Sequence, residues 1–283
     1  MSTGPLNPET STSLPSPPFV HLKGIPNFRD LGGYKVADSD ALFRRGYIYR
    51  CGEPTSATPE AIEIIRGLGV NHIFDLRSLP EIQKMQVAGT GPKTVDWPGV
   101  TRVFTPVFRE ESYDPVSLAK RHADYQSEGS EGMVNAYRAI LTEGANSYGI
   151  ILRHILEDSR REKNGDKNAL IFHCTAGKDR TGVLGALLLG LCGVPDQVVA
   201  EEYNLTEAGL GEWTELLVKA VLKQGATSEK GARRMVGARK ESMINTLAMV
   251  REEFGGPENY IVTRCGLTKE EVAEIRNFLI VSE

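Results

Sequence analysis

The segment from 169 to 182 constrains the fold more than any other part of the chain. It reads ALIFHCTAGKDRTG, in which an apolar run of strand type leads into a short loop with a cysteine, a glycine and an arginine. Five residues separate the cysteine from the arginine, and a second apolar run, 183–192, is typical of a buried helix. The pattern predicts a strand that enters a helix N-terminus, where backbone N–H groups and the positive end of the helix dipole converge.

A loop of this kind binds an anion of phosphate size, and it favours the thiolate form of a cysteine at its centre. Cys174 is therefore the expected nucleophile. Arg180 is expected to grip two phosphoryl oxygens at once, because its guanidinium is a planar fork. The loop residues predicted to bind the phosphate are Thr175, Ala176, Gly177, Lys178 and Thr181.

Four of the loop residues have more specific expected roles. Gly177 lets the backbone approach the phosphate oxygens, and Thr181 donates a hydrogen bond to the departing thiolate. His173 supports the loop through hydrogen bonds rather than by touching substrate. For Lys178 two interpretations stay open: it meets a second negative group of the substrate, or it points to solvent or pairs with a nearby carboxylate.

The loop has two other interpretations. A cysteine after an apolar strand is often a small core residue, and a glycine before a helix is often part of a simple turn. Rhodanese-type sulfurtransferases also place a cysteine loop near a helix. The combination of His173-Cys174 with Arg180-Thr181-Gly182 favours phosphoryl chemistry over both.

Composition limits the remaining possibilities. A chain of 283 residues with 40% hydrophobic and 25% charged residues is typical of a globular protein with a sizeable core. The net charge of −4 argues against a nucleic-acid partner, and no apolar run is long enough for a transmembrane segment. Neither the histidines nor the four scattered cysteines have metal-ligand spacing, so we expect no metal and no cofactor. A thiolate that must stay reduced fits the cytoplasm.

The predicted organisation is one domain after a tail. Residues 1–18 are rich in Pro, Ser and Thr, which indicates a disordered tail, and residues 19–283 form a single domain. Strands are expected over 42–49 and 70–76, with a helix between them that Thr58 caps and Pro59 begins. Further strands are expected over 101–107 and 169–172. The other segments are expected to be mainly helical: 114–160, 195–203, 211–222, 229–254 and 268–281.

The cysteine loop resembles that of the atypical tyrosine phosphatases of bacteria and fungi, whose loop reads H-C-x-A-G-K-D-R-T-G. The resemblance extends over about 24–281. Besides the loop, the similar stretches are 27–34, 43–45, 50–53, 75–78 with Glu81, and 260–278.

The resemblance implies an α/β cysteine-phosphatase fold, with a central parallel-rich sheet flanked by helices, an all-helical C-terminal half and a helical lid within 108–145. It implies a protein-tyrosine-phosphatase-type phosphoric monoester hydrolase that acts through a phosphocysteine, with dual or phosphoinositide activity. Its partners would be a phosphorylated protein, a phosphoinositide or a small phosphate ester. A catalytically idle phospho-binding module and a phosphatase of a small metabolite are the alternatives.

Three questions about the site stay open. The identity of the general acid is the first. The resemblance implies an acid on the loop after Thr105-Pro106, but no Asp directly follows that proline, so Asp179 is our first choice. Glu110, Glu111 and Asp114 are the alternatives. Cys51 is either a packed core residue or a redox partner of Cys174. The acidic and basic side chains near the other similar stretches are expected to form buried salt bridges that brace the loops around the site: Arg29, Asp30, Arg77 and Glu81.

Overall fold

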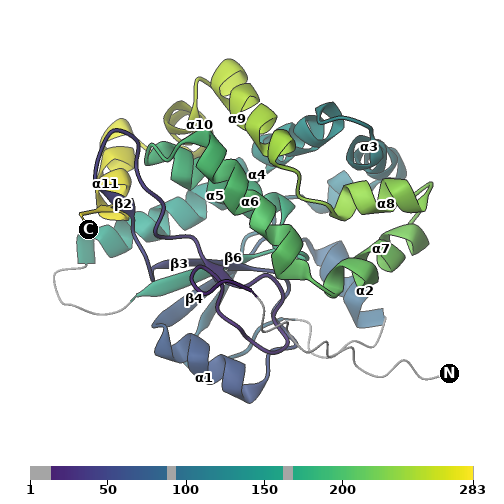
Figure 1. Cartoon of the computed structure of the whole chain (residues 1–283), viewed down its shortest axis with the longest axis horizontal. Coiled ribbons are helices and arrows are strands. Elements are labelled where there is room, and N and C mark those ends of the chain that lie inside the picture. The colour runs from purple at the N-terminus through teal and green to yellow at the C-terminus, as the bar shows by residue number, and fades with distance from the viewer. Residues whose placement is uncertain (1–13, 88–93, 162–167, 283) are drawn as a thin grey trace.

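The computed structural model describes residues 14–87, 94–161 and 168–282. Its centre is a five-stranded sheet (Figure 1) in which the strand order is β1-β3-β6-β4-β5. β1 is antiparallel to its neighbour and the other pairs are parallel, which confirms the predicted α/β class with a parallel-rich sheet. The strands are β1 (Arg29–Asp30), β3 (Ile48–Cys51), β6 (Ala169–His173), β4 (Val70–Asp75) and β5 (Thr101–Phe104); β2 (Leu42–Phe43) pairs separately with β7 (Ile280–Val281).

Eleven helices are present in the described part of the chain, and one short 3₁₀ helix, η1 (Glu110–Tyr113), precedes α3. The helices are α1 (Pro59–Gly67), α2 (Leu79–Val87), α3 (Pro115–Gln126), α4 (Glu131–Arg161), α5 (Asp179–Leu191), α6 (Asp196–Leu210), α7 (Trp213–Lys223), α8 (Glu229–Val236), α9 (Lys240–Phe254), α10 (Pro257–Cys265) and α11 (Lys269–Leu279).

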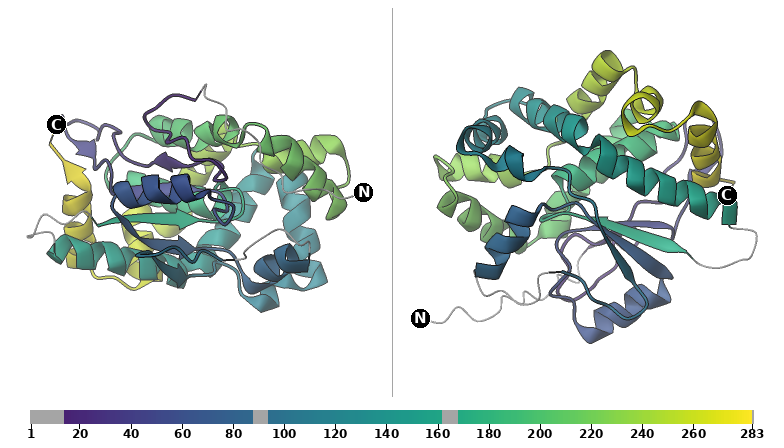
Figure 2. Two further views of the ribbon diagram at one scale, coloured as in Figure 1. Left: turned by 90° about the horizontal axis from the view of Figure 1, so that it is seen from below. Right: turned by 180° about the vertical axis from the view of Figure 1, so that it is seen from behind.

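Helices cover both faces of the sheet (Figures 1 and 2). α1 packs on one face, and α4, α5 and the C-terminal helices pack on the other. The side chains of β6 alternate between the two faces of the sheet. Leu170 and Phe172 pack in the large apolar cluster with α4 and α5, whereas Ile171 packs in the smaller cluster with α1. A strand that is buried on both faces reads as a continuous apolar run, which is why 169–172 shows no alternation.

Local capping signals predicted helix starts well. The Thr58 side chain accepts a hydrogen bond from the backbone of Ala61 at the start of α1, and Thr268 with Glu271 forms a capping box at the start of α11. The strand predicted over 42–49 is wrong in detail, because β2 and β3 are separate strands. The single helix predicted over 229–254 is also wrong, since α8 and α9 are separated at 237–239.

Most of the predicted N-terminal tail lies outside the described residues. Within its last five residues, 14–18, the Pro18 carbonyl accepts a hydrogen bond from the Asp30 backbone at 3.0 Å. None of the described helices has the length and apolar character needed to cross a membrane.

Candidate active site

The cysteine loop lies where β6 ends and α5 begins. Cys174 directly follows β6 at the carboxyl edge of the parallel strands, and only 1% of it is exposed. Asp179 is the first residue of α5, so the loop between them leads directly into a helix N-terminus, as the sequence predicts.

Side chains from outside the loop fix the orientation of its peptide groups. The Asn27 amide donates to the carbonyls of Ala176 and Gly177 at 3.1 and 3.2 Å, and Arg50 donates to Gly177 at 2.8 Å. The Glu53 backbone donates to the Thr175 carbonyl at 3.0 Å. In a trans peptide the N–H points opposite to the carbonyl, so these outward carbonyls turn the following N–H groups toward the centre of the loop. The result is an anion-binding cradle.

Gly177 is required by the path of the loop. Its φ angle is +65°, in the left-handed region that favours glycine. A Cβ at this position would lie 2.3 Å from the carbonyl carbon and oxygen of Cys51. The close approach that Gly177 allows is therefore to the end of β3.

Two neighbouring residues form hydrogen bonds with Cys174. The Thr181 hydroxyl donates to the Cys174 sulfur at 3.0 Å. His173 Nδ1 lies 3.2 Å from the Cys174 carbonyl, and since a carbonyl only accepts, Nδ1 carries the proton of this hydrogen bond. Burial lowers the pKa of His173 to about 4, only partly offset by Asp75, so its ring is neutral near pH 7.

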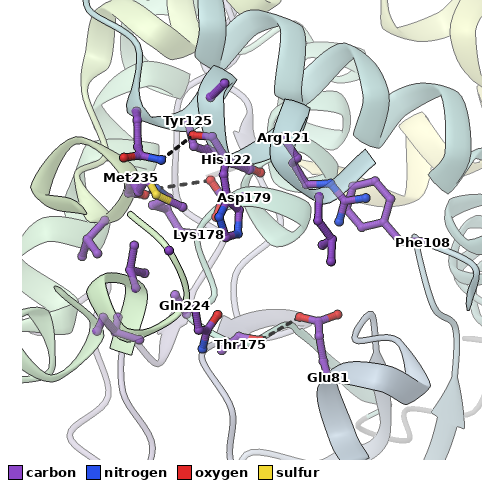
Figure 3. A pocket seen from close by; sticks show the side chains of 18 of the residues that line it. Glu81, Phe108, Arg121, His122, Tyr125, Thr175, Lys178, Asp179, Gln224 and Met235 are labelled. Carbon is purple, nitrogen blue, oxygen red and sulfur yellow. Dashed lines mark hydrogen bonds and ion pairs between the residues drawn. The ribbon is translucent and has the colours of Figure 1, made fainter. Parts of the chain in front are cut away.

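Arg180 is held by Glu81, a residue of the first turn of α2. Its Nη1 and Nη2 lie 2.6 and 2.7 Å from the two Glu81 oxygens. Burial opposes ionisation of Glu81, but the adjacent guanidinium outweighs it and holds the pKa of Glu81 well below its usual range. Glu81 also accepts hydrogen bonds from Ser78, Tyr113 and Thr175. Figure 3 shows Glu81 and Thr175 on one side of the site.

A buried ion-pair cluster supports the loop from below. Glu202 of α6 contacts Arg29 at 2.7 Å and Arg50 at 2.6 Å, and all three side chains are buried. Because Arg50 also binds the loop carbonyls, this cluster connects α6 to the cysteine loop. Glu202 was missed by the sequence reasoning, since a single glutamate in a helix gives no signal that two distant arginines will meet it.

Of the other two predicted bracing residues, Arg77 has the expected ion pair and Asp30 does not. Arg77 pairs with Asp75 at 2.8 Å, and Asp75 pairs in addition with Arg102. The two Asp30 oxygens accept from the backbones of Gly32 and Gly46, so Asp30 fixes a turn rather than forming a salt bridge.

Lys178 and Asp179 lie together on the opposite side of the site from Glu81 (Figure 3). The Lys178 ammonium donates to the carbonyls of Met235 and Gly237 at the end of α8, and it lies 3.3 Å from an Asp179 oxygen. Tyr137 donates to that same oxygen at 2.8 Å. The Lys178 side chain is 1% exposed, whereas 23% of the Asp179 side chain is exposed.

A cavity of about 800 Å³ opens above the loop, with Cys174 among its lining residues. Walls come from α2, α3, α7 and the end of α8 as well as from the loop (Figure 3). The sequence indicated α3 as part of a lid within 108–145, but α7 and α8 as walls were missed because their place depends on packing between distant helices. That this segment acts as a lid stays a prediction.

The three alternative acids lie elsewhere. Glu110, Glu111 and Asp114 are exposed and are not among the described residues that line the cavity. Asp114 instead caps α3 by accepting from two backbone N–H groups. Cys51 ends β3 beside β6 and is fully buried, and burial raises the pKa of its thiol well above the ordinary value. Its redox role stays a prediction.

Comparisons with known proteins agree with this geometry. The chain is 30% identical over 179 residues to a putative tyrosine-protein phosphatase of Cupriavidus necator, covering 63% of this chain and 59% of that protein. It is 30% identical over 112 residues to a tyrosine-protein phosphatase of Nostoc commune, or 38% of each chain. A triple specificity protein phosphatase, PtpB of Mycobacterium tuberculosis, is 26% identical, with 92% of this chain and 98% of that protein covered.

These alignments span about three fifths and two fifths of the first two relatives and nearly all of the third. The family model for tyrosine phosphatases matches residues 20–281, which includes both the sheet and the C-terminal helices. The chain belongs to the tyrosine phosphatase family.

Proposed function

We propose that the protein is a cysteine-dependent phosphomonoester hydrolase that acts on phosphotyrosine. One observation carries the proposal. Cys174 lies in a loop whose peptide N–H groups are turned inward, and the Thr181 hydroxyl donates a hydrogen bond to the Cys174 sulfur. Such a loop stabilises both a thiolate and the oxygens of a transferring phosphoryl group.

In the proposed reaction the Cys174 thiolate attacks phosphorus while the ester P–O bond breaks. The leaving oxygen takes a proton from Asp179, whose carboxyl group is partly exposed to the cavity. Arg180 and the loop N–H groups bind the phosphoryl oxygens. Water then attacks the phosphocysteine and gives a proton to the Asp179 carboxylate, which restores the acid. The S–P bond breaks, inorganic phosphate leaves, and Thr181 donates its hydrogen bond to the departing thiolate.

Turnover of p-nitrophenyl phosphate by Cys174→Ser tests the proposal. We expect activity to be lost, while vanadate still binds because the cradle is retained. Cys192→Ser is the matched control, since Cys192 is also buried but lies about 20 Å away at the far end of α5. Activity above about a tenth of wild type in Cys174→Ser would be incompatible with covalent catalysis by this residue. Vanadate binding without turnover in the wild type would instead identify a phospho-binding module.

A further inference from the structure

The cavity above Cys174 is larger than a phosphotyrosine side chain requires. Its volume of about 800 Å³ lies in the upper part of the roughly 300–1,000 Å³ range of pockets that hold whole drug-sized ligands. A phosphotyrosine whose phosphorus reaches Cys174 fills only the part next to the loop. The rest of the cavity has room for another part of the substrate.

Much of the remaining lining is apolar and comes from α3 and α7, with His122, Gln126, Gln224 and Thr227 as polar neighbours. On α7, Leu217 and Val221 are four residues apart and so share one helix face. On α3, Ala119 and Ala123 are also four residues apart and share one helix face, and the neighbouring Leu118 lines the cavity as well. We call the apolar wall the annex; its residues are Leu118, Ala119, Ala123, Leu217, Val221 and Val236.

The annex is continuous with the catalytic loop. Leu217 and Val221 are only half-buried, and they pack on an apolar cluster that Ala176 of the loop also contacts. The cavity is also lined by Phe108, by Tyr113 of η1 and by Tyr125 of α3, whose rings suit an aryl phosphate. When the phosphate of a substrate lies at Cys174, the group next to the aromatic ring of that substrate therefore reaches the annex.

The charges that line the cavity do not suit a second phosphate. Among the described lining residues, Lys178 donates to the carbonyls at the end of α8, and Arg180 is held by Glu81 and, in the proposed reaction, binds the transferring phosphoryl group. Arg121 donates to the Ser112 carbonyl, and its guanidinium stacks 3.9 Å from the Phe108 ring centre. A second phosphate that entered here would lose its hydration without gaining an unengaged lysine or arginine, which is costly beside an apolar wall.

We propose that the annex binds a large apolar side chain adjacent to phosphotyrosine, so that the enzyme selects phosphotyrosyl peptides with an apolar neighbour. Phosphoinositides with several ring phosphates are disfavoured by the same wall. The proposal rests on the proposed function and adds the residues that determine its specificity.

The test compares kcat/KM for two phosphotyrosyl peptides that differ only in carrying Leu or Asp on both sides of the phosphotyrosine. The wild type should prefer the Leu peptide by about tenfold or more, the value expected for burying one or two apolar side chains. Leu217→Gln should reduce this preference about tenfold. Leu222→Gln, the matched control on the same helix, should leave it unchanged, because Leu222 is exposed and is not a lining residue.

A second variant guards against misfolding of Leu217→Gln. Ala123 is exposed on α3, so Ala123→Leu fills the annex without disturbing the core, and it should also lower kcat/KM for the Leu peptide selectively. Thermal unfolding of each variant confirms that it is folded.

Three results would overturn the proposal: no preference in the wild type, equal changes in Leu217→Gln and Leu222→Gln, or higher kcat/KM on a soluble short-chain phosphatidylinositol bisphosphate than on either peptide. p-Nitrophenyl phosphate separates this failure from failure of the proposed function. If the wild type hydrolyses p-nitrophenyl phosphate but shows no preference between the two peptides, only the annex proposal is refuted. If the wild type does not hydrolyse p-nitrophenyl phosphate, the proposed function fails as well.

Discussion

Glu81 and Arg180 meet through two contacts, with Nη1 2.6 Å from one carboxylate oxygen and Nη2 2.7 Å from the other. An arginine has five N–H donors. Besides Glu81, Nη1 donates to the Leu76 carbonyl at 3.4 Å and Nη2 to the Thr175 hydroxyl at 3.5 Å, and these longer contacts are the ones that phosphate oxygens would replace. Glu81 therefore fixes the plane of the guanidinium before substrate arrives. Because the guanidinium is already held in place, the arginine loses less conformational entropy in the transition state.

Glu81→Gln should lower kcat/KM by about 10- to 100-fold, because a charge-assisted hydrogen bond to a partly buried arginine contributes about 1.5–3 kcal/mol. The inhibition constant of inorganic phosphate should weaken in parallel, which reports the loss of ordered Arg180 rather than a change in the nucleophile. The measurement is steady-state kinetics with phosphate as inhibitor. Unchanged phosphate inhibition would show that Glu81 does not act through Arg180.

Asp179→Asn should slow aryl phosphates with poor leaving groups by about 10²–10⁴-fold, and those with good leaving groups far less. An acidic phenol leaves without a proton, whereas a basic one needs it. The measurement is kcat/KM across a series of substituted phenyl phosphates, with Glu110→Gln as control because Glu110 is exposed outside the cavity. A uniform loss across the series would assign Asp179 a structural role instead.

Lys178→Met should reduce kcat/KM on a phosphotyrosine peptide and on a soluble phosphoinositide to the same extent. The ammonium of Lys178 binds the carbonyls at the end of α8, and its loss leaves them unsatisfied. The free energy of unfolding should therefore fall by about 1–3 kcal/mol. Denaturant titration and the two kinetic assays check both effects. A loss confined to the phosphoinositide, with stability retained, would instead support contact with a second phosphate.

His173 should make the fold sensitive to mild acid. Its pKa is lowered from 6.5 to about 4 by burial, so the folded protein binds fewer protons than the unfolded chain between these values. The contribution of His173 to the free energy of unfolding is fully present above pH 6.5. It declines as the pH falls toward 4, by about 3 kcal/mol in all. In His173→Asn the free energy of unfolding should fall less over this window. Identical pH dependence in both proteins would rule out the effect.

Local signals predicted the elements that depend on a few neighbouring residues. Thr58-Pro59 and Thr268 with Glu271 begin helices as expected, because a cap is satisfied within one turn. One such signal was overlooked: Glu81 reaches back to the Ser78 backbone at 2.9 Å, so Ser78-Leu-Pro-Glu81 marks the start of α2.

Elements that depend on distant residues were not predictable in this way. The break between α8 and α9 is stabilised by α6, where Asn204 donates to the Ala238 carbonyl and Glu207 accepts from its N–H. Without these partners the sequence over 229–254 reads as one helix. The same limit applies to the cavity: Cys174, Arg180 and Thr181 come from one contiguous motif, whereas Leu217 and Val221 reach the site only through the packing of α7.

The position of Glu202 between Arg29 and Arg50 has a consequence for how the protein matures during synthesis. The two arginines belong to the first fifth of the chain, but their shared counter-ion lies beyond the catalytic motif, on α6. Leaving buried charges without a partner typically costs about 3–5 kcal/mol. A growing chain that ends before α6 therefore cannot form the ion-pair cluster that supports the cysteine loop. The cradle around Cys174 is therefore complete only after α6 has docked, because Arg50 binds Glu202 on one side and the Gly177 carbonyl of the loop on the other.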